Sequence, residues 1–153
     1  MKNHIRKTVD VEGVVQGVGF RPTVHRLASE AKLGGSVQNR AGVVRIVLEG
    51  PESTVELFLK ELPGSLPTQA TLRRMEMVET ENISEEDVSR KFRIIESLSG
   101  DSPRVSIPAD LGICEACHSE LFDPNDRRYG SPFTTCTDCG PRYTVVNSMP
   151  YDR

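Results

Sequence analysis

The chain has 153 residues and a net charge of −3, and apolar residues of the AVILMFWYC set make up 37% of it. These values are typical of a folded protein and exclude a disordered chain, a collagen and a simple coiled coil. No apolar run approaches the ~18 residues of a membrane span, and the opening MKNHIRK lacks the apolar region of a signal peptide. We therefore expect a cytoplasmic protein that does not insert into a membrane.

The first elements alternate between strand and helix patterns. Thr8–Val15 alternates apolar and polar residues, as a half-buried strand does. Pro22 opens a segment whose apolar residues have helical spacing, and Gly34–Gly35 ends it. Two short strands follow, Ser36–Asn39 and Val43–Glu49, and a tight turn joins them.

The remaining elements of residues 1–96 repeat this order. A second helix begins near Pro51 and stops at Pro63–Gly64, and strands are expected at Leu72–Glu79 and Lys91–Ile95. The order is therefore βαββαβ with an added edge strand. It predicts an α+β, ferredoxin-like sandwich: a mostly antiparallel sheet with both helices on one face.

A glycine-bearing loop, GVVQGVGFRP (13–22), joins the first strand to the first helix. It completes neither the GxGxxG pattern nor a P-loop, which excludes both nucleotide-binding loops. A glycine turn at a helix N-terminus, with Arg21 beside it, favours a small anion such as phosphate. The alternative is an ordinary turn with a surface arginine.

Two motifs are similar to those of the acylphosphatase family: VEGVVQGVGFR (11–21) and GSVQN (35–39). The resemblance implies that Arg21 binds the phosphoryl oxygens and that the Asn39 amide holds the attacking water. It also implies a phosphate-binding loop made of Gln16, Gly17, Val18, Gly19 and Phe20. An acyl phosphate has a good leaving group, so positioning and charge stabilisation suffice without a metal or a covalent intermediate. One departure from the family pattern is that two residues, not three, separate Asn39 from Gly42.

A Ser-, Pro- and Gly-rich stretch, 97–110, is typical of a linker, and all four cysteines follow it in the segment 111–153. Their spacing, C-x2-C-x18-C-x2-C, predicts a closed structural zinc site. The ligands would be Cys114, Cys117, Cys136 and Cys139. A redox dithiol, disulfides and a haem attached at CEACH (114–118) explain the four cysteines less well. The neighbouring Arg127 and Arg128 could contact a partner or an acidic substrate, but such a pair is more typical of a solvated loop.

The cysteine segment, with DRRY, CGPR and MPYDR around its two knuckles, is similar to the first finger of the hydrogenase-maturation carbamoyltransferase family, HypF. The resemblance implies an N-terminal part of such an enzyme, acting before further domains. It implies hydrolysis of carbamoyl phosphate to carbamate and phosphate as the first step of carbamoyl transfer. Delivery to HypE, for nickel–iron hydrogenase, would then need the downstream domains.

Two functions therefore remain. The first is an acyl phosphate hydrolase, and the second is a catalytically weak anion-binding scaffold with a zinc-stabilised protein-docking module. The shorter turn after Asn39 favours the second function, while the complete loop and Arg21 favour the first. Nucleic-acid binding is disfavoured, because the net charge is negative, no RNP1 run is present, and the chain has only 5 Phe, 3 Tyr and no Trp.

Overall fold

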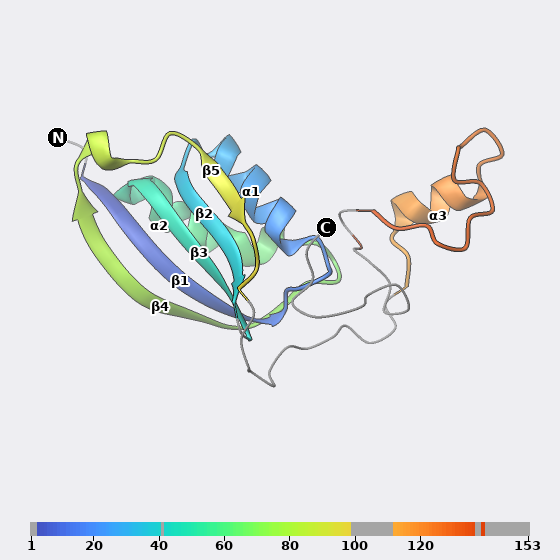
Figure 1. Ribbon diagram of the computed structural model, residues 1–153, viewed down its shortest axis with the longest axis horizontal. Coiled ribbons are helices and arrows are strands. Elements are labelled where there is room, and N and C mark those ends of the chain that lie inside the picture. The colour runs from blue at the N-terminus through green and yellow to red at the C-terminus, as the bar shows by residue number, and fades with distance from the viewer. Residues whose placement is uncertain (1–2, 41, 99–111, 137–138, 140–153) are drawn as a thin grey trace.

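The computed structural model describes residues 3–40, 42–98, 112–136 and 139, which form an α+β domain and a separate finger (Figure 1). The elements of the domain, in chain order, are β1 (His4–Val14), α1 (Phe20–Glu30), β2 (Gly34–Arg40), β3 (Val43–Pro51), α2 (Glu52–Glu61), β4 (Thr71–Ile83) and β5 (Phe92–Ile95). Short 3-10 turns lie at Leu62–Ser65 and Glu85–Asp87, and the finger contains α3 (Glu115–Phe122). No helix among the described residues is both long and apolar enough to cross a membrane.

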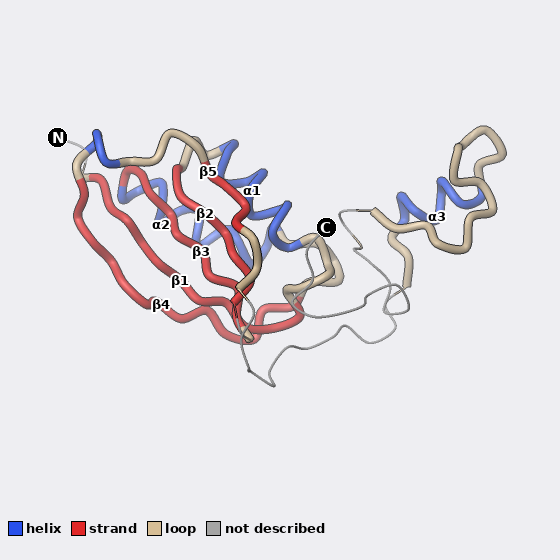
Figure 2. Tube along the Cα trace, in the orientation of Figure 1, coloured by secondary structure: helices blue, strands red, loops and turns tan. Residues whose placement is uncertain are grey.

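The five strands form one sheet in the order β4-β1-β3-β2-β5, and only the β2–β5 pair is parallel. Helices α1 and α2 lie on the same face of this sheet (Figures 1 and 2). The predicted ferredoxin-like sandwich with an added edge strand is therefore confirmed. Because β1 and β2 both run antiparallel to β3, the C-terminal ends of β1, β2 and β5 lie at the same end of the sheet.

The core lies between the sheet and the two helices. Alternate residues of each central strand point into it, which is the period-2 pattern expected from the sequence. Its fully buried apolar side chains from strands and helices include Ile5, Val9, Val11, Phe20, Val24, Ala28, Val37, Val44, Ile46, Leu48 and Val55. Full burial of each large aliphatic side chain contributes about 1.5–3 kcal/mol, so this layer holds the site-bearing loops in place.

Several elements begin or end outside the predicted limits. Helix α1 starts at Phe20, two residues before Pro22. Proline is tolerated in the first turn of a helix, because the N–H groups there have no partner within the helix. Strand β4 runs from Thr71 to Ile83, beyond the predicted Glu79, because it pairs along the whole length of β1. Most of the predicted linker, Ala41 and residues 140–153 lie outside the described residues.

Glu49 of β3 is a buried carboxylate on the face of the sheet opposite the helices. It accepts hydrogen bonds from Arg6 Nε at 2.7 Å and from the Ser89 backbone N–H at 2.8 Å. Burial alone raises the pKa of the Glu49 carboxyl, but the hydrogen bonds from Ser89 and Arg6 outweigh it and hold the pKa below its usual value. The ionised form therefore stabilises the folded domain.

We expect Glu49→Gln to lower the free energy of unfolding by about 1–3 kcal/mol at neutral pH, because it removes charge-assisted hydrogen bonds. A folded-state pKa below the unfolded one stabilises the protein above the unfolded pKa, and this stabilisation is lost as the pH falls through the folded pKa. Urea unfolding of both proteins should therefore show a difference in the free energy of unfolding near pH 7. This difference should shrink as the pH falls below 4.5, the ordinary pKa of a glutamate carboxyl. A difference that does not change with pH would contradict this assignment.

Candidate functional site

The loop after β1 carries two glycines in the left-handed region, which side chains disfavour. Gly17 has a φ of 71°, and Gly19, the N-cap of α1, has a φ of 73° and a ψ of 12°. Such turns bring successive backbone N–H groups to one side and form an anion-binding concavity. The positive end of the α1 dipole adds to the attraction, so the loop has the local structure expected of a phosphate-binding site.

Arg21 is the second residue of α1, immediately after this loop. Its side chain is half-buried, and its Nη1 atom lies 3.5 Å from the Ser97 hydroxyl oxygen, a long hydrogen bond. Ser97 follows the end of β5, so the guanidinium lies at the end of the sheet where β1, β2 and β5 terminate. The sequence-predicted arginine thus occupies the same corner of the fold as the glycine loop.

Asn39 lies one residue before the end of β2, on the side of the strand that faces the helices. It pairs with Val44 in the β2–β3 ladder, and Arg40 pairs with Val43. Its backbone carbonyl accepts a hydrogen bond from the Leu98 N–H at 2.9 Å. Arg21 and Asn39 therefore contact adjacent residues, 97 and 98, and lie at the same corner.

The side-chain amide of Asn39 is completely buried, and its Oδ1 and Nδ2 atoms have no hydrogen-bond partner among the described residues. The Oε1 atom of the buried Gln16 is also without a partner in that part of the chain. Leaving a buried amide unpaired costs about 1–3 kcal/mol. Such atoms are retained where a bound ligand or water completes their hydrogen bonding, as at a functional site.

Sequence reasoning missed the contribution of residues 96–98 to this corner. Gln38 of β2 donates a hydrogen bond from Nε2 to the Glu96 carbonyl at 2.8 Å, next to the Leu98 contact with Asn39. The serine-rich composition of this stretch indicates only a linker. The contacts of this stretch with β2 follow from the parallel pairing of β5 with β2, which depends on tertiary structure and leaves no local pattern.

The finger brings its four cysteines together as predicted. All four sulfur atoms lie within 4.8 Å of one another, and three of the Sγ–Sγ distances are 3.5, 3.6 and 3.7 Å. A tetrahedral Zn²⁺ with Zn–S bonds of about 2.3 Å places its sulfurs about 3.8 Å apart. The cluster therefore fits a structural zinc ion held by Cys114, Cys117, Cys136 and Cys139. With four protein ligands the site is closed to substrate.

Burial and hydrogen bonding together set the pKa values in the cysteine cluster. Burial raises the pKa of the Cys117 thiol above its ordinary value of 9.0. At Cys139 burial also acts to raise the pKa, but hydrogen bonds from the backbone at Cys114 and Cys136 and from nearby thiols outweigh it and lower the pKa to about 6. A bound cation favours the thiolate form of every ligand, so zinc removes the cost of bringing these groups together.

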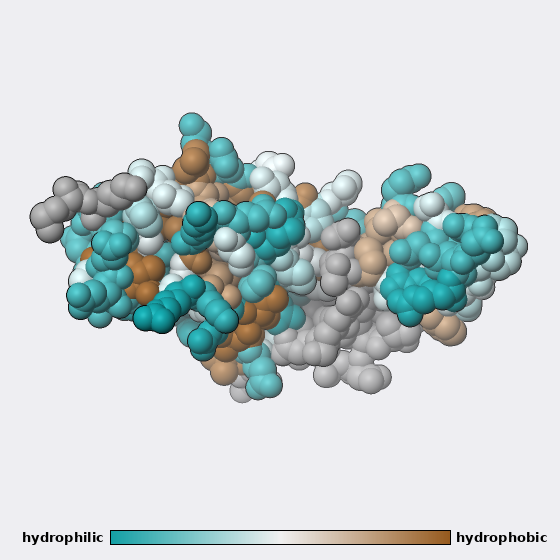
Figure 3. Space-filling view, turned by 90° about the horizontal axis from the view of Figure 1, so that it is seen from above, coloured by the Kyte–Doolittle hydropathy of each residue, from teal (hydrophilic) through white to brown (hydrophobic). Residues whose placement is uncertain are grey.

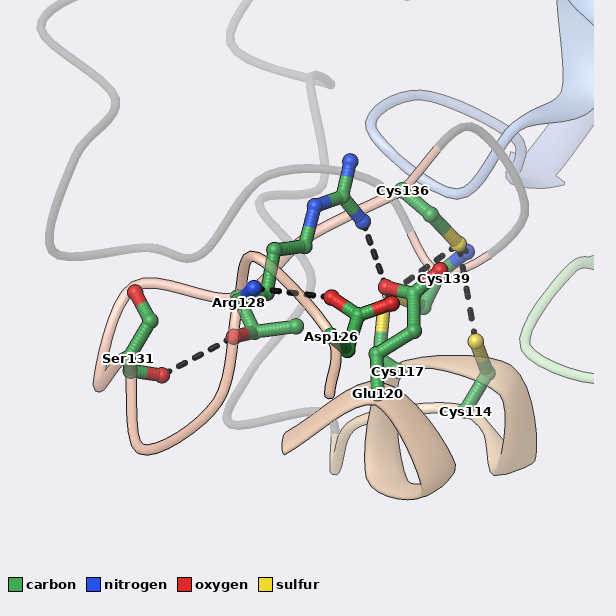
Figure 4. A network of polar contacts seen from close by, with 9 residues as sticks. Cys114, Cys117, Glu120, Asp126, Arg128, Ser131, Cys136 and Cys139 are labelled. Atoms are coloured by element: carbon green, nitrogen blue, oxygen red, sulfur yellow. Dashed lines mark hydrogen bonds and ion pairs between the residues drawn. The ribbon is translucent and has the colours of Figure 1, made fainter. Parts of the chain in front are cut away.

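A polar network organises the loop beside the cysteines (Figure 4). The Arg128 guanidinium donates to Glu120 of α3 at 2.6 Å, and its backbone N–H donates to Asp126 Oδ1 at 2.7 Å. Both charged side chains of the Arg128–Glu120 pair are about one-third exposed. The expectation of a merely solvated arginine is therefore wrong for Arg128, which ties the loop to the helix that carries Cys117.

Comparison with known proteins yields two family matches. The acylphosphatase family matches residues 7–94, and the HypF finger family matches residues 113–146. The probable carbamoyltransferase HypF of Methanocaldococcus jannaschii is 42% identical over 146 residues, which are 95% of this chain and 19% of that protein. The chain thus spans about a fifth of the length of the curated HypF relatives that it matches.

A shorter relative and a solved structure agree with these matches. The acylphosphatase of Lactobacillus gasseri is 34% identical over 89 residues, which are 58% of this chain and 94% of that protein. A crystal structure of full-length HypF in a phosphate- and nucleotide-bound form matches with a TM-score of 0.81 at 33% identity. It covers 99% of this chain and 20% of that protein. The chain is therefore similar to an acylphosphatase over its first domain and to HypF over both domains.

Proposed function

Because the chain belongs to the acylphosphatase family and carries a HypF finger after that domain, we propose that it hydrolyses acyl phosphates, with carbamoyl phosphate as its substrate. The observation that carries this proposal is the buried Asn39 amide, whose two polar atoms have no partner in the described residues, at the corner that also holds Arg21. An anion-binding loop, a cation and an unpaired amide together suit phosphoryl transfer to water.

The proposed reaction uses the residues of this corner directly. The N–H groups of the glycine loop and the Arg21 guanidinium bind the phosphoryl oxygens and stabilise their charge. Asn39 orients a water molecule, whose oxygen forms the new bond to phosphorus. The bond from phosphorus to the carbamoyl oxygen breaks, and its electron pair leaves with carbamate. The water proton is lost to solvent and the second product is inorganic phosphate.

The short turn after Asn39 is compatible with this geometry. Two residues suffice to connect β2 and β3 because Arg40 and Val43 already pair, and Gly42 supplies the left-handed φ of 83°. Asn39 is therefore fixed by the strand ladder and not by the loop. The alternative function, a catalytically weak anion-binding scaffold with a zinc-stabilised docking module, rests on the same short turn and predicts phosphate binding without turnover.

We also propose that this activity belongs to a longer reaction sequence, a proposal that the HypF matches support. We propose that carbamate formation is the first step of carbamoyl transfer in nickel–iron hydrogenase maturation. The zinc stabilises the finger and takes no part in this step. Downstream domains of a longer enzyme would activate the carbamate, and HypE would accept the carbamoyl group.

Phosphate release from carbamoyl phosphate and acetyl phosphate by the zinc-loaded chain tests the proposed function. We expect hydrolysis of both above the uncatalysed rate, because both have carboxylate-type leaving groups. A phosphate ester such as p-nitrophenyl phosphate should not be turned over. Tight binding of inorganic phosphate without hydrolysis of either acyl phosphate would instead support the scaffold function.

We expect Asn39→Ala to lower kcat for carbamoyl phosphate about 100-fold, because the attacking water is no longer oriented. The free energy of unfolding should fall little or not at all, since the lost amide is unpaired in the described part of the fold. Steady-state kinetics and urea unfolding of the same sample measure both effects. A large loss of stability together with unchanged kcat would contradict the role of Asn39.

A further inference from the structure

The three residues that follow β5 make contacts with both proposed functional residues. The Glu96 carbonyl accepts from Gln38 Nε2 at 2.8 Å, and the Leu98 N–H donates to the Asn39 carbonyl at 2.9 Å. Between them, the Ser97 hydroxyl oxygen lies 3.5 Å from Arg21 Nη1. One short segment therefore contacts the helix that carries Arg21 and the strand that carries Asn39.

The strand register explains why these contacts occur together. Strand β5 pairs in parallel with β2, with Val37 opposite Ile94 and Gln38 opposite Ile95. The chain beyond Ile95 continues in the same direction and reaches the end of β2, where Asn39 lies. This segment lies outside the acylphosphatase family match, which ends at residue 94.

From these contacts we infer that residues 97 and 98 are positioning residues for the phosphate site, an inference that rests on the proposed function. Arginine has a flexible side chain whose rotamer freedom must be restricted before it can bind an anion in a fixed geometry. The Ser97 hydroxyl restricts Arg21 through a hydrogen bond from Arg21 Nη1, a contact with a neutral group.

The Leu98 backbone acts on Asn39 in a different way. Its N–H fixes the carbonyl of Asn39 and hence the backbone from which the buried amide extends. Small displacements of a group that orients the nucleophile reduce the rate steeply, whereas substrate binding by the loop and Arg21 is unaffected. Ser97 should therefore affect phosphate affinity, and Leu98 should affect turnover.

The first test compares Ser97→Ala, Ser97→Thr and, as a matched control, Ser29→Ala, which removes an exposed hydroxyl bonded to the His25 carbonyl. Isothermal titration with inorganic phosphate measures Kd, and carbamoyl phosphate hydrolysis gives KM and kcat. We expect Ser97→Ala to raise Kd and KM about fivefold, because one hydrogen bond is lost. Its kcat should stay within about twofold of that of the unsubstituted chain. Ser97→Thr and Ser29→Ala should behave like the unsubstituted chain.

The second test compares Leu98→Pro, which lacks the N–H donor, with Leu98→Ala, which keeps it. We expect kcat to fall about tenfold in the proline variant only, with phosphate Kd unchanged and the urea unfolding midpoint lowered by no more than the loss of one hydrogen bond. In the unsubstituted chain the Leu98 amide should also exchange slowly with solvent.

The outcomes separate this inference from the proposed function. If the unsubstituted chain shows no turnover, the proposed function fails, while phosphate Kd and Leu98 amide exchange still decide the inference. Equal phosphate affinity for Ser97→Ala and the unsubstituted chain, or a fast-exchanging Leu98 amide, would overturn it. So would a failure of the unsubstituted chain to bind phosphate at all, because Arg21 would then not be held in a binding position.

Discussion

Arg21→Ala is expected to reduce kcat/KM for carbamoyl phosphate about 1000-fold. Phosphoryl transfer depends on stabilising charge on the phosphoryl oxygens, and removing one preorganised donor costs about 10²–10³ in rate, more where the donor is a cation. Arg21 combines a bidentate donor with a full positive charge beside the glycine loop. Phosphate release by the two proteins under identical conditions measures the loss.

The folded structure should tolerate the Arg21 substitution. Arg21 lies in the first turn of α1, where a positive charge is unfavourable next to the positive end of the helix dipole. Alanine also has the highest helix propensity. We therefore expect the urea unfolding midpoint to be unchanged or raised. A cation kept at the end of a helix where the helix dipole disfavours it is typical of a binding group.

Two further variants separate charge from geometry. Arg21→Lys keeps the charge but loses the bidentate fork, so its activity should lie between those of the alanine variant and the unsubstituted chain. Arg26→Ala is the matched control, since Arg26 lies on the same helix and pairs with Glu30 at 3.1 Å on the exposed surface. It should retain full activity. Equal activity of Arg21→Ala and Arg26→Ala would contradict the assignment.

The fold could be predicted from the sequence because its core residues recur with regular periods. The alternation through Val9 and Val11, and the helical spacing of Val24 and Ala28, depend on local chain geometry alone. Element limits could not be predicted so well. The length of β4 is set by its pairing with β1, and such a partner is not visible in the strand's own residues.

The candidate site was predictable where its residues are close in sequence. The glycine loop and Arg21 form one motif, and the cysteine pairs have a spacing set by metal geometry. Contacts between distant residues could not be predicted, such as Ser97 with Arg21 or Arg128 with Glu120. Each of these joins an ordinary surface residue type to a partner that only the folded chain brings near.

Removal of zinc is expected to unfold the finger and leave the first domain folded. Among the described finger residues, 112–136 and 139, the buried ones are Cys117, Thr134 and Cys139, none of them a large apolar side chain. The finger surface seen in Figure 3 is largely hydrophilic. So small a segment cannot order itself without a cross-link, and structural zinc supplies about 10 kcal/mol or more.

The first domain should survive because its core is independent of the finger. The apolar cluster between the sheet and the helices contains residues from Ile5 to Phe92 and none from the described part of the finger. Circular dichroism after chelation should therefore show a loss of α3 signal only. Amide spectra should lose dispersed resonances from the finger while those of β1 and β3 persist, and added zinc should restore the finger.

Cys117→Ser provides the corresponding variant, because Cys117 is the buried ligand on α3. We expect it to bind less than one zinc per chain, whereas Ser119→Ala, on the exposed side of the same helix, should bind one. Zinc must displace the protons of the ligand thiols, so the zinc affinity should fall as the pH is lowered. The fall should be steeper below the Cys139 pKa of about 6, because zinc must then displace a proton from Cys139 as well. A chromogenic chelator assay across pH measures both effects. Dispersed finger resonances in metal-free protein would show that the cysteine cluster does not depend on zinc for its fold.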